Sequence, residues 1–380
     1  MRVYPFCMVN NNFKNNYLYG KDFFMSRKIL DIKHHLSSGC CMWSGIEDVY
    51  ATKTDQTIPG AFLFALSSFG ESIFLKIKDT NRPFMFSVAD GRTRKTYDRI
   101  KDIIGLNYQI SEGKTLKYAL KSIKREIDAG NPVILGPLDM YYLPYLKMYH
   151  KEHIPMHYVL MVGYDEEKDC MLIYDCDREK LQELPQMELI QAWNIEKNEV
   201  GDKNGFIRFS LSENTIDKYK LADICFRNKA MRQLCNKPDF VGVNAYNKIA
   251  LEFPSWKDKF SEEEYRNVLV AITEFFGMVP KLPNEILGVN EKEDICYDGN
   301  YNRLGNILLN LGDEYQRDDW TQAGKLFCQC GTLIKDITDR IIRFYCHNED
   351  CLSEIPNIFI KIGNNSEQAY KRILEYKGEN

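Results

Sequence analysis

The sequence lacks a hydrophobic run long enough to cross a membrane. A membrane-spanning helix needs about 20 mostly apolar residues, and no stretch of the 380 residues approaches that length. Residues 1–16 also lack the apolar core and small-residue cleavage site of a secretory signal. We therefore expect a cytoplasmic protein with no membrane partner.

An excess of positive charge is also missing. The chain has 50 Lys and Arg against 54 Asp and Glu, which gives a formal net charge of −4. Nucleic-acid-binding domains carry a clear basic surface, so we expect no nucleic-acid partner. Phosphate-binding loops and Gly-x-Gly dinucleotide motifs are absent as well, and we expect no bound cofactor.

The 12 cysteines do not follow the close spacing of a disulfide scaffold. Reduced thiols are therefore expected. A C-terminal group resembles a set of zinc ligands, but Cys328 and Cys330 fall within a helical pattern, where residues two apart point to different sides. We predict that no metal is bound by this group, which consists of Cys328, Cys330, Cys346, His347 and Cys351.

The chain is too long for one typical hydrophobic core, so two domains are expected. Strand-like and helical segments alternate up to about residue 215, whereas helical periodicity dominates afterwards. We predict an α+β domain over residues 1–215 and a mostly α-helical domain over residues 216–380.

The expected elements follow from apolar periodicity and from turn residues. Helices are expected at residues 41–51, 60–69, 114–129, 242–251, 262–276, 301–311, 318–343 and 367–376. Strands are expected at residues 72–78, 83–88, 133–135, 157–164, 170–174 and 205–211, the third of them ending before Gly136-Pro137.

Three short motifs in the first half carry the chemistry. Cys41 opens a helix, His157 opens an apolar strand 116 residues later (157 − 41), and Asp175 closes the next strand. A thiol, an imidazole and a carboxylate in this order can supply a nucleophile, a general base and an orienting group. The combination predicts acyl transfer through a covalent thioester.

Cys41 is the preferred nucleophile because a helix N-terminus lowers the pKa of a thiol. Its neighbour Cys40 is the rival, one residue outside the helix, and burial as small hydrophobic side chains is the alternative for both. His157 has five rivals as the base, but only His157 begins a strand of this kind. The rivals are His34, His35, His150, His153 and His347.

Asp175 is predicted to reach Nδ1 of His157 from the neighbouring antiparallel strand, which would fix the tautomer and stabilise the imidazolium. Asp165 and Asp177 compete for this role. Aspartate is common in turns, so turn formation is the alternative for all three.

These residues resemble the butirosin biosynthesis protein H family, and the order of the three groups is that of papain-like cysteine proteases. The resemblance runs from about residue 35 to residue 177 and is weaker in the helical half. Family members often carry His-Cys where this chain has Cys40-Cys41. The matching features are Cys41 followed by Gly45 and Ile46, residues 131–134, His157-Tyr158, Gly163-Tyr164-Asp165, and Asp175.

The resemblance implies a papain-like N-terminal domain that works as an amide-forming acyltransferase in antibiotic biosynthesis. It implies that the acyl group arrives as a thioester on the phosphopantetheine of a carrier protein and leaves on a small amine. A related enzyme implied in closthioamide assembly joins carrier-bound acyl chains to a diamine. His35, six residues before Cys41, is predicted to donate to the oxyanion, with a solvated loop histidine as the alternative.

Two other functions stay open at this point. A cysteine peptidase or amidase of the same fold would hydrolyse amides and need no carrier protein. A non-catalytic binding protein would keep the fold without a reactive thiol.

Overall fold

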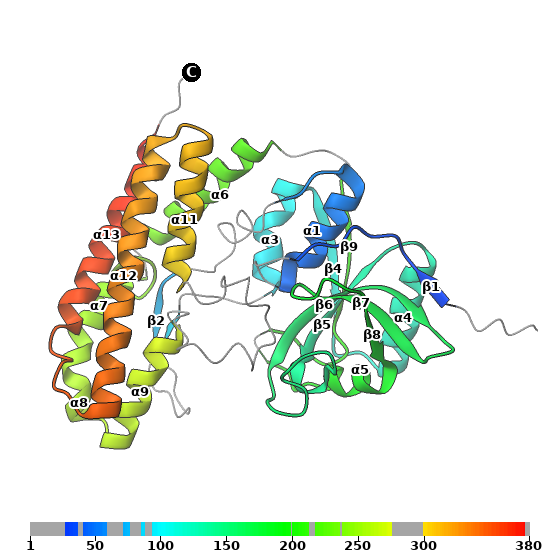
Figure 1. Ribbon diagram of the computed structural model, residues 1–380, viewed down its shortest axis with the longest axis horizontal. Coiled ribbons are helices and arrows are strands. Elements are labelled where there is room, and N and C mark those ends of the chain that lie inside the picture. Colours follow the sequence, from blue (N-terminus) through cyan, green and yellow to red (C-terminus); the bar gives the residue numbers. More distant parts are fainter. Residues whose placement is uncertain are drawn as a thin grey trace, which may run out of the picture.

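The computed structural model describes residues 27–36, 41–58, 71–76, 85–87, 93–198, 200–212, 217–235, 238–275 and 299–376. Strands and one group of helices lie on one side of the molecule, and a bundle of helices lies on the other (Figure 1). The expected α+β class is confirmed by this mixture of helices and an antiparallel sheet.

Within these ranges the main sheet has seven strands, in the order β4-β9-β5-β6-β7-β8, with β1 also paired to β6. Every pair in it is antiparallel. The bounds are β1 Arg27–Ile29, β4 Leu106–Ser111, β5 Val133–Asp139, β6 Pro155–Asp165, β7 Cys170–Tyr174, β8 Gln182–Pro185 and β9 Phe206–Leu211.

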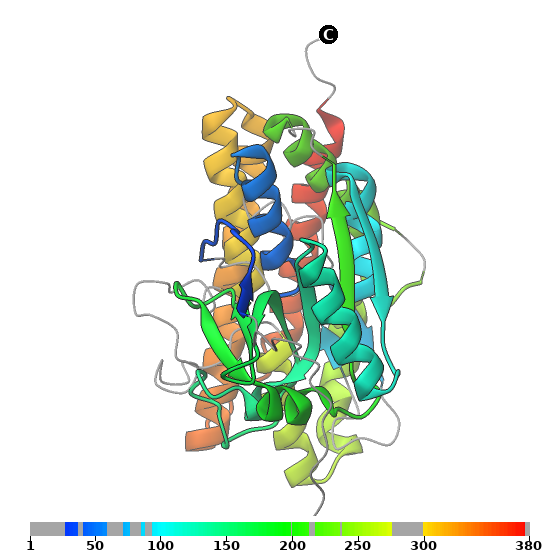
Figure 2. The same ribbon diagram turned by 90° about the vertical axis from the view of Figure 1, so that its right-hand side faces the viewer.

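Strand β6 is buried on both faces, so its sequence is a nearly continuous apolar run. Successive side chains point to opposite faces of a sheet. Leu160 and Val162 accordingly belong to one hydrophobic core, while Val159 and Met161 belong to a second. The first core faces α1 (Cys41–Thr54) and α3 (Thr93–Ile104), and the second faces α4 (Leu116–Asp128) and α5 (Gln186–Trp193) (Figures 1 and 2).

Helix α1 packs directly against β6, and a glycine permits the close approach. A Cβ atom at Gly45 would lie 2.9 Å from Cδ1 and 3.1 Å from Cβ of Leu160. The first turn of the helix is also held from α3, because the hydroxyl of Tyr97 donates a hydrogen bond to the carbonyl of Met42. The end of α1 that carries Cys41 is therefore fixed against the sheet and α3.

The described residues of the second half of the chain lie mostly in helices. Helices α11, α12 and α13 lie side by side as long rods (Figure 1). Side chains at three- and four-residue steps along α12, including Phe327, Cys330, Ile334 and Ile337, are buried. The bounds are α6 Lys218–Gln233, α7 Asn244–Glu252, α8 Trp256–Lys259, α9 Glu262–Phe275, α11 Gly299–Glu314, α12 Asp318–His347 and α13 Ile355–Glu375.

A segment of the first half packs against this helical half. Strand β2 (Ile73–Leu75) pairs with β3 (Met85–Ser87), and Phe74 donates a backbone hydrogen bond of 2.8 Å to Phe240. The buried hydroxyl of Ser72 contacts those of Tyr246 at 3.0 Å and Tyr301 at 3.1 Å. The two halves therefore share a core, and the expected boundary near residue 215 stays a proposal.

Most expected elements in the described ranges are found, with one clear error. The strand expected at 133–135 continues through Gly136-Pro137 to Asp139. Proline is tolerated there because the pairing with β6 shifts register between Leu135 and Leu138. The helix expected at 367–376 begins earlier, at Ile355, as α13. The elements that were not predicted are helices α3, α5, α6 and α8 and strands β1, β4 and β8, and the helix expected at 60–69 lies outside the described residues.

In the part of the chain that the structure describes, no helix combines the length and the apolar character that crossing a membrane requires.

Replacing Gly45 with leucine tests the contact between α1 and β6. We expect Gly45→Leu to lower the free energy of unfolding by about 1–3 kcal/mol, because the added side chain overpacks the contact with Leu160. Lys53→Leu, at an exposed position of the same helix, removes one hydrogen bond to the carbonyl of Leu211 and should lower it by only about 1 kcal/mol or less. Chemical denaturation measures both, and equal stability of Gly45→Leu and wild type would contradict the packing described.

Candidate active site

Cys41 is the first residue of α1 and is partly exposed. The backbone N–H groups of a first helical turn and the helix dipole favour a negative charge at this position. Its thiol interacts with the ring of His157. The structure therefore brings the predicted nucleophile and base together, while Cys40 lies outside the described residues.

The register of β6 and β7 explains how His157 meets Asp175. Met161 is paired with Ile173. His157 lies four residues before Met161, near the start of β6, and Asp175 directly follows β7, so both lie at the same end of this strand pair. Nε2 of His157 lies 2.7 Å from Oδ2 of Asp175. Both side chains are buried, with 8% and 1% of their surfaces exposed.

The expected contact between Asp175 and Nδ1 of His157 is wrong, because the carboxylate binds Nε2. Since Nε2 faces the carboxylate, Nδ1 is the nitrogen left for the thiol. The orienting role is the same on either nitrogen: a hydrogen-bonded carboxylate fixes the tautomer of the ring and stabilises its protonated form.

The electrostatics of the site favour an imidazolium. Burial lowers the pKa of His157, but the negative charges of Asp175 and of the Cys41 thiolate outweigh burial and raise this pKa well above its ordinary value. Burial likewise raises the pKa of Asp175, and its interaction with His157 turns the net change into a lowering. The site therefore suits a thiolate, an imidazolium and a carboxylate side by side.

Asp175 has two further hydrogen-bond donors. The hydroxyl of Tyr145 donates to Oδ2 at 2.7 Å, and the backbone N–H of Cys176 donates to Oδ1 at 2.7 Å. Burial and the charge of Asp175 raise the pKa of Tyr145, so this phenol stays protonated and keeps donating. No local pattern in the sequence indicates that Tyr145 contacts a residue 30 positions away.

The two competing aspartates occupy different places. Asp165 ends β6, eight residues from His157, which is roughly 26 Å along an extended strand. It accepts hydrogen bonds from the backbone of Glu167 and Lys168, so it forms the turn. Asp177 is close to Asp175, and burial together with the Asp175 charge raises its pKa to about 6.

His35 interacts with two buried carboxylates of α1. Its Nδ1 lies 2.7 Å from Oδ1 of Asp48, and its Nε2 lies 3.6 Å from Oε2 of Glu47. These partners follow Cys41 by six and seven residues, about 10 Å along the helix axis. The contacts favour a role in holding the helix, and donation to the oxyanion stays a prediction.

The remaining histidines lie in other surroundings. His34 contacts Asp48, and His153 contacts Asp139, each at 2.6 Å. His150 and His347 are exposed. Among the described residues, His157 is thus the histidine that interacts with both Cys41 and Asp175.

Potential metal ligands come close together at one place in the described ranges. Ligand atoms of Asp175, Cys176 and Asp177 lie within 4.8 Å of one another. Asp175 already accepts three hydrogen bonds there. In the helical half, the thiol of Cys330 faces Ser366 at 3.5 Å and that of Cys351 donates to the carbonyl of Arg340 at 3.3 Å.

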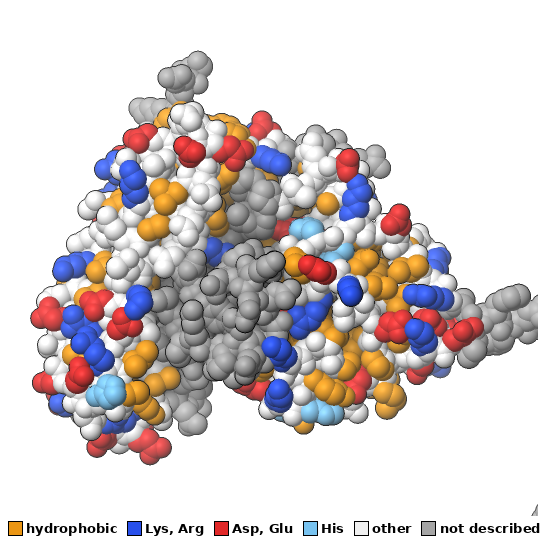
Figure 3. Space-filling model, viewed as in Figure 1, with side chains coloured by type: hydrophobic (Ala, Val, Ile, Leu, Met, Phe, Trp, Pro, Cys, Tyr) orange, Lys and Arg blue, Asp and Glu red, His pale blue; other side chains and the backbone are white. Residues whose placement is uncertain are grey.

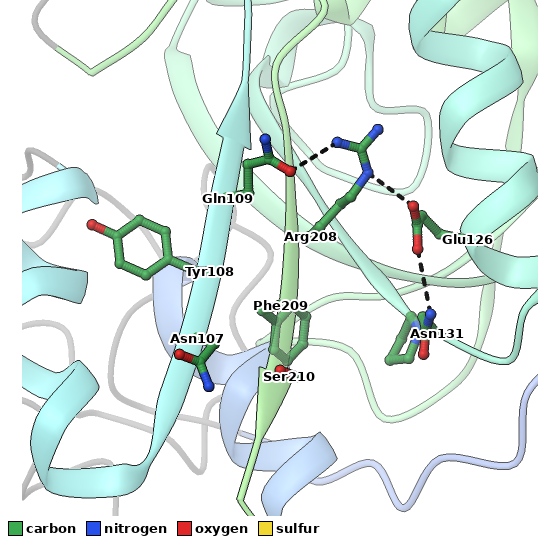
Figure 4. Close-up of a pocket in the computed structure, with 9 residues that line it drawn as sticks. Asn107, Tyr108, Gln109, Glu126, Asn131, Arg208, Phe209 and Ser210 are labelled. Atoms are coloured by element: carbon green, nitrogen blue, oxygen red, sulfur yellow. Dashed lines mark hydrogen bonds and ion pairs between the residues drawn. The ribbon is translucent and has the colours of Figure 1, made fainter.

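A polar pocket of about 340 Å³ lies at the opposite end of β5 from the strand end that faces His157. Figure 4 shows Arg208 of β9 pointing between Gln109 and Glu126, with Glu126 also bound to Asn131. On the face shown in Figure 3, the described charged side chains of both signs are interspersed over the helical bundle. The residues that line this pocket do not include Cys41, His157 or Asp175.

Removing the hydroxyl of Tyr145 should weaken the site without changing its packing. We expect Tyr145→Phe to slow alkylation of Cys41 at neutral pH about tenfold, because a hydrogen bond to a charged group is lost. Tyr149→Phe is a matched control, since that hydroxyl donates at the same 2.7 Å to Glu188. Mass spectrometry of the alkylated peptide gives the rates, and equal rates for the two variants would contradict the role of Tyr145.

The pairing of His35 predicts how stability depends on pH. Its hydrogen bonds to Asp48 and Glu47 raise the pKa of His35 from an ordinary 6.5 to about 10. A raised folded-state pKa stabilises the protein below about pH 6.5, and this contribution is lost as the pH rises through about 10. We expect the free energy of unfolding to fall over this range in wild type and to fall less in His35→Gln. Denaturation curves at several pH values measure both, and parallel declines would contradict the pairing.

Comparison with known proteins gives a match in the first half of the chain. The family model for butirosin biosynthesis protein H, N-terminal, matches residues 40–176. This segment contains Cys41, His157 and Asp175, and the helical half lies outside it. No curated protein matches the chain. Residues 40–176 are thus similar to the N-terminal part of butirosin biosynthesis protein H.

Proposed function

We propose that this protein is an amide-forming N-acyltransferase that works through a Cys41 acyl-enzyme. The observation that carries the proposal is the chain of contacts from Cys41 to His157 to Asp175. A cysteine at the start of a helix packed on an antiparallel sheet, with its histidine at the beginning of a strand, also supports a papain-like fold for residues 1–215. The helical domain, residues 216–380, is proposed to cover the acyl-enzyme and exclude water.

In the first half-reaction the Cys41 thiolate attacks the carbonyl carbon of a thioester. A carbon–sulfur bond forms, and the tetrahedral oxyanion collapses to expel the thiolate of the donor. His157 gives its proton to that leaving thiolate. We propose that the donor is a carrier protein that presents the acyl group on its phosphopantetheine. One thioester replaces another, so this step is nearly balanced in energy and reversible.

In the second half-reaction a neutral amine attacks the Cys41 thioester. The neutral His157 removes a proton from the attacking nitrogen, the bond to Cys41 breaks, and the amide leaves. The thiolate and the imidazolium are restored together, with Asp175 stabilising the charge on the ring. Because an amide is more stable than a thioester, this step drives the cycle. We further propose that the amine acceptor is a diamine, as in closthioamide assembly.

A cysteine peptidase or amidase would use the same three residues. The two functions differ in the acceptor: water completes hydrolysis, whereas an amine completes transfer. When the purified protein is given an acyl thioester with and without an added amine, transfer predicts an amide product and little free acid. Free acid alone, or cleavage of a peptide panel, would support the hydrolase instead.

The acyl-enzyme is tested by mixing the protein with acyl-N-acetylcysteamine thioesters and measuring its intact mass. We expect a mass increase of one acyl group in wild type and Cys40→Ala, and none in Cys41→Ala, because Cys41 is placed at the start of α1 and interacts with the base. Cys235→Ala, which removes another exposed thiol, serves as a control and should load normally.

Two results would count against this assignment. Loading that is lost in Cys40→Ala but kept in Cys41→Ala would move the nucleophile by one residue. Failure of wild type to load from any thioester would contradict acyl transfer and favour a binding protein.

A further inference from the structure

His34 connects the helix of the nucleophile to the turn of the carboxylate. Its side chain is 6% exposed and lies in the segment between β1 and α1. Nδ1 lies 2.6 Å from Oδ2 of Asp48 in α1, and Nε2 lies 2.7 Å from the carbonyl oxygen of Arg178. The ring also stacks on Tyr174 of β7, with centroids 4.2 Å apart and planes 9° from parallel.

Both partners of the ring nitrogens are hydrogen-bond acceptors. A carboxylate and a carbonyl oxygen have no proton to give, so each ring nitrogen must carry one, and the ring is an imidazolium. Burial lowers the pKa of His34, but the hydrogen bond and the charge of Asp48 reverse this effect and leave the pKa raised. The other titratable groups around it are His35, which opposes the positive charge, and the ring of Tyr174.

The carbonyl that His34 binds belongs to Arg178, the last residue of the turn that carries Asp175. The backbone N–H of Arg178 donates to the carbonyl of Asp175 at 3.1 Å, so these two residues are the ends of one turn. The guanidinium of Arg178 then reaches back to the carbonyl of Tyr145 at 3.4 Å, and Tyr145 donates to Asp175. Fixing the carbonyl of Arg178 therefore fixes the turn from which the Asp175 carboxylate points.

The other partner, Asp48, lies seven residues after Cys41 on the same helix, about two helical turns away. Because α1 is rigid, holding Asp48 also sets the position of Cys41. One buried ring thus spans the two elements that supply the nucleophile and the orienting carboxylate.

We propose that His34 is a positioning residue, which sets the distance between α1 and the turn after β7 and so aligns Cys41 with His157 and Asp175. This inference rests on the proposed triad but not on the identity of the acyl donor or acceptor. His34 touches none of the reacting atoms. Its loss should loosen the contact between thiol and imidazole rather than remove either group.

The test compares the pH dependence of Cys41 alkylation in wild type and His34→Gln. A glutamine amide cannot donate in two opposite directions as the imidazolium does. Wild type should react rapidly at about pH 6, where an isolated thiol is protonated. We expect His34→Gln to lose about tenfold in rate at pH 6 and about twofold or less near pH 9, where any thiol ionises.

His153→Gln is the matched control. His153 pairs with Asp139 at the same 2.6 Å and stacks on Tyr141 at 4.0 Å, but its ring does not connect α1 to the turn after β7. Its alkylation profile should match wild type.

Imidazole added to His34→Gly should restore the rate of Cys41 alkylation at pH 6, because imidazole can occupy the vacated site between the same two acceptors.

A His34→Gln profile with the wild-type shape would overturn the proposal, even if the melting temperature falls, because that result indicates a purely structural role. If the variant does not fold, nitrogen NMR of wild type decides: two ring N–H groups on His34 at neutral pH support the proposal, and one contradicts it. If Cys41 of wild type is not alkylated rapidly at pH 6, that result would contradict the triad of Cys41, His157 and Asp175. The proposed function and the positioning role of His34 would then both be wrong.

Discussion

A buried pair of charges, the imidazolium of His157 and the carboxylate of Asp175, is the interaction on which the rest of the site depends. Burying either charge alone would cost several kcal/mol. The pair is tolerated because its members lie 2.7 Å apart and Asp175 accepts two further hydrogen bonds. Each partner therefore shifts the pKa of the other toward the charged form, and that charge on the ring is what keeps a thiolate beside it.

The fold supplies this pair by strand register and supplies the thiol by helix packing. Antiparallel pairing of β6 with β7 places His157 and Asp175 at one end of this strand pair, and Gly45 lets α1 lie close to β6. His34 then joins α1 to the turn after β7 through two short hydrogen bonds. Sheet, helix and turn are thus fixed relative to one another.

The sequence predicted the elements that have strong local signals. The helix that begins at Cys41, the apolar strand that begins near His157 and the amphipathic helix α4 all follow from periodicity and capping residues. It did not predict that β5 passes through Gly136-Pro137, since a proline normally ends a strand unless the pairing partner shifts register.

The hydrogen bonds around Cys41, His157 and Asp175 could not be predicted from the sequence, for a different reason. The contacts of Tyr145 with Asp175 and of His34 with Arg178 join residues 30 and 144 positions apart, and no local pattern specifies such pairs. The nitrogen of His157 that faces Asp175 depends in the same way on how two strands cross, and the expected Nδ1 was replaced by Nε2.

The most direct test of the account is the ionisation of the Cys41 thiol, followed by its ultraviolet thiolate absorbance as the pH is lowered. Wild type is compared with His157→Ala, and Cys41→Ser provides the baseline. The account predicts that wild type keeps its thiolate well below the ordinary thiol pKa of about 8.5 and that His157→Ala loses it near that value. A wild-type titration near 8.5, unchanged by His157→Ala, would contradict the thiolate–imidazolium pair.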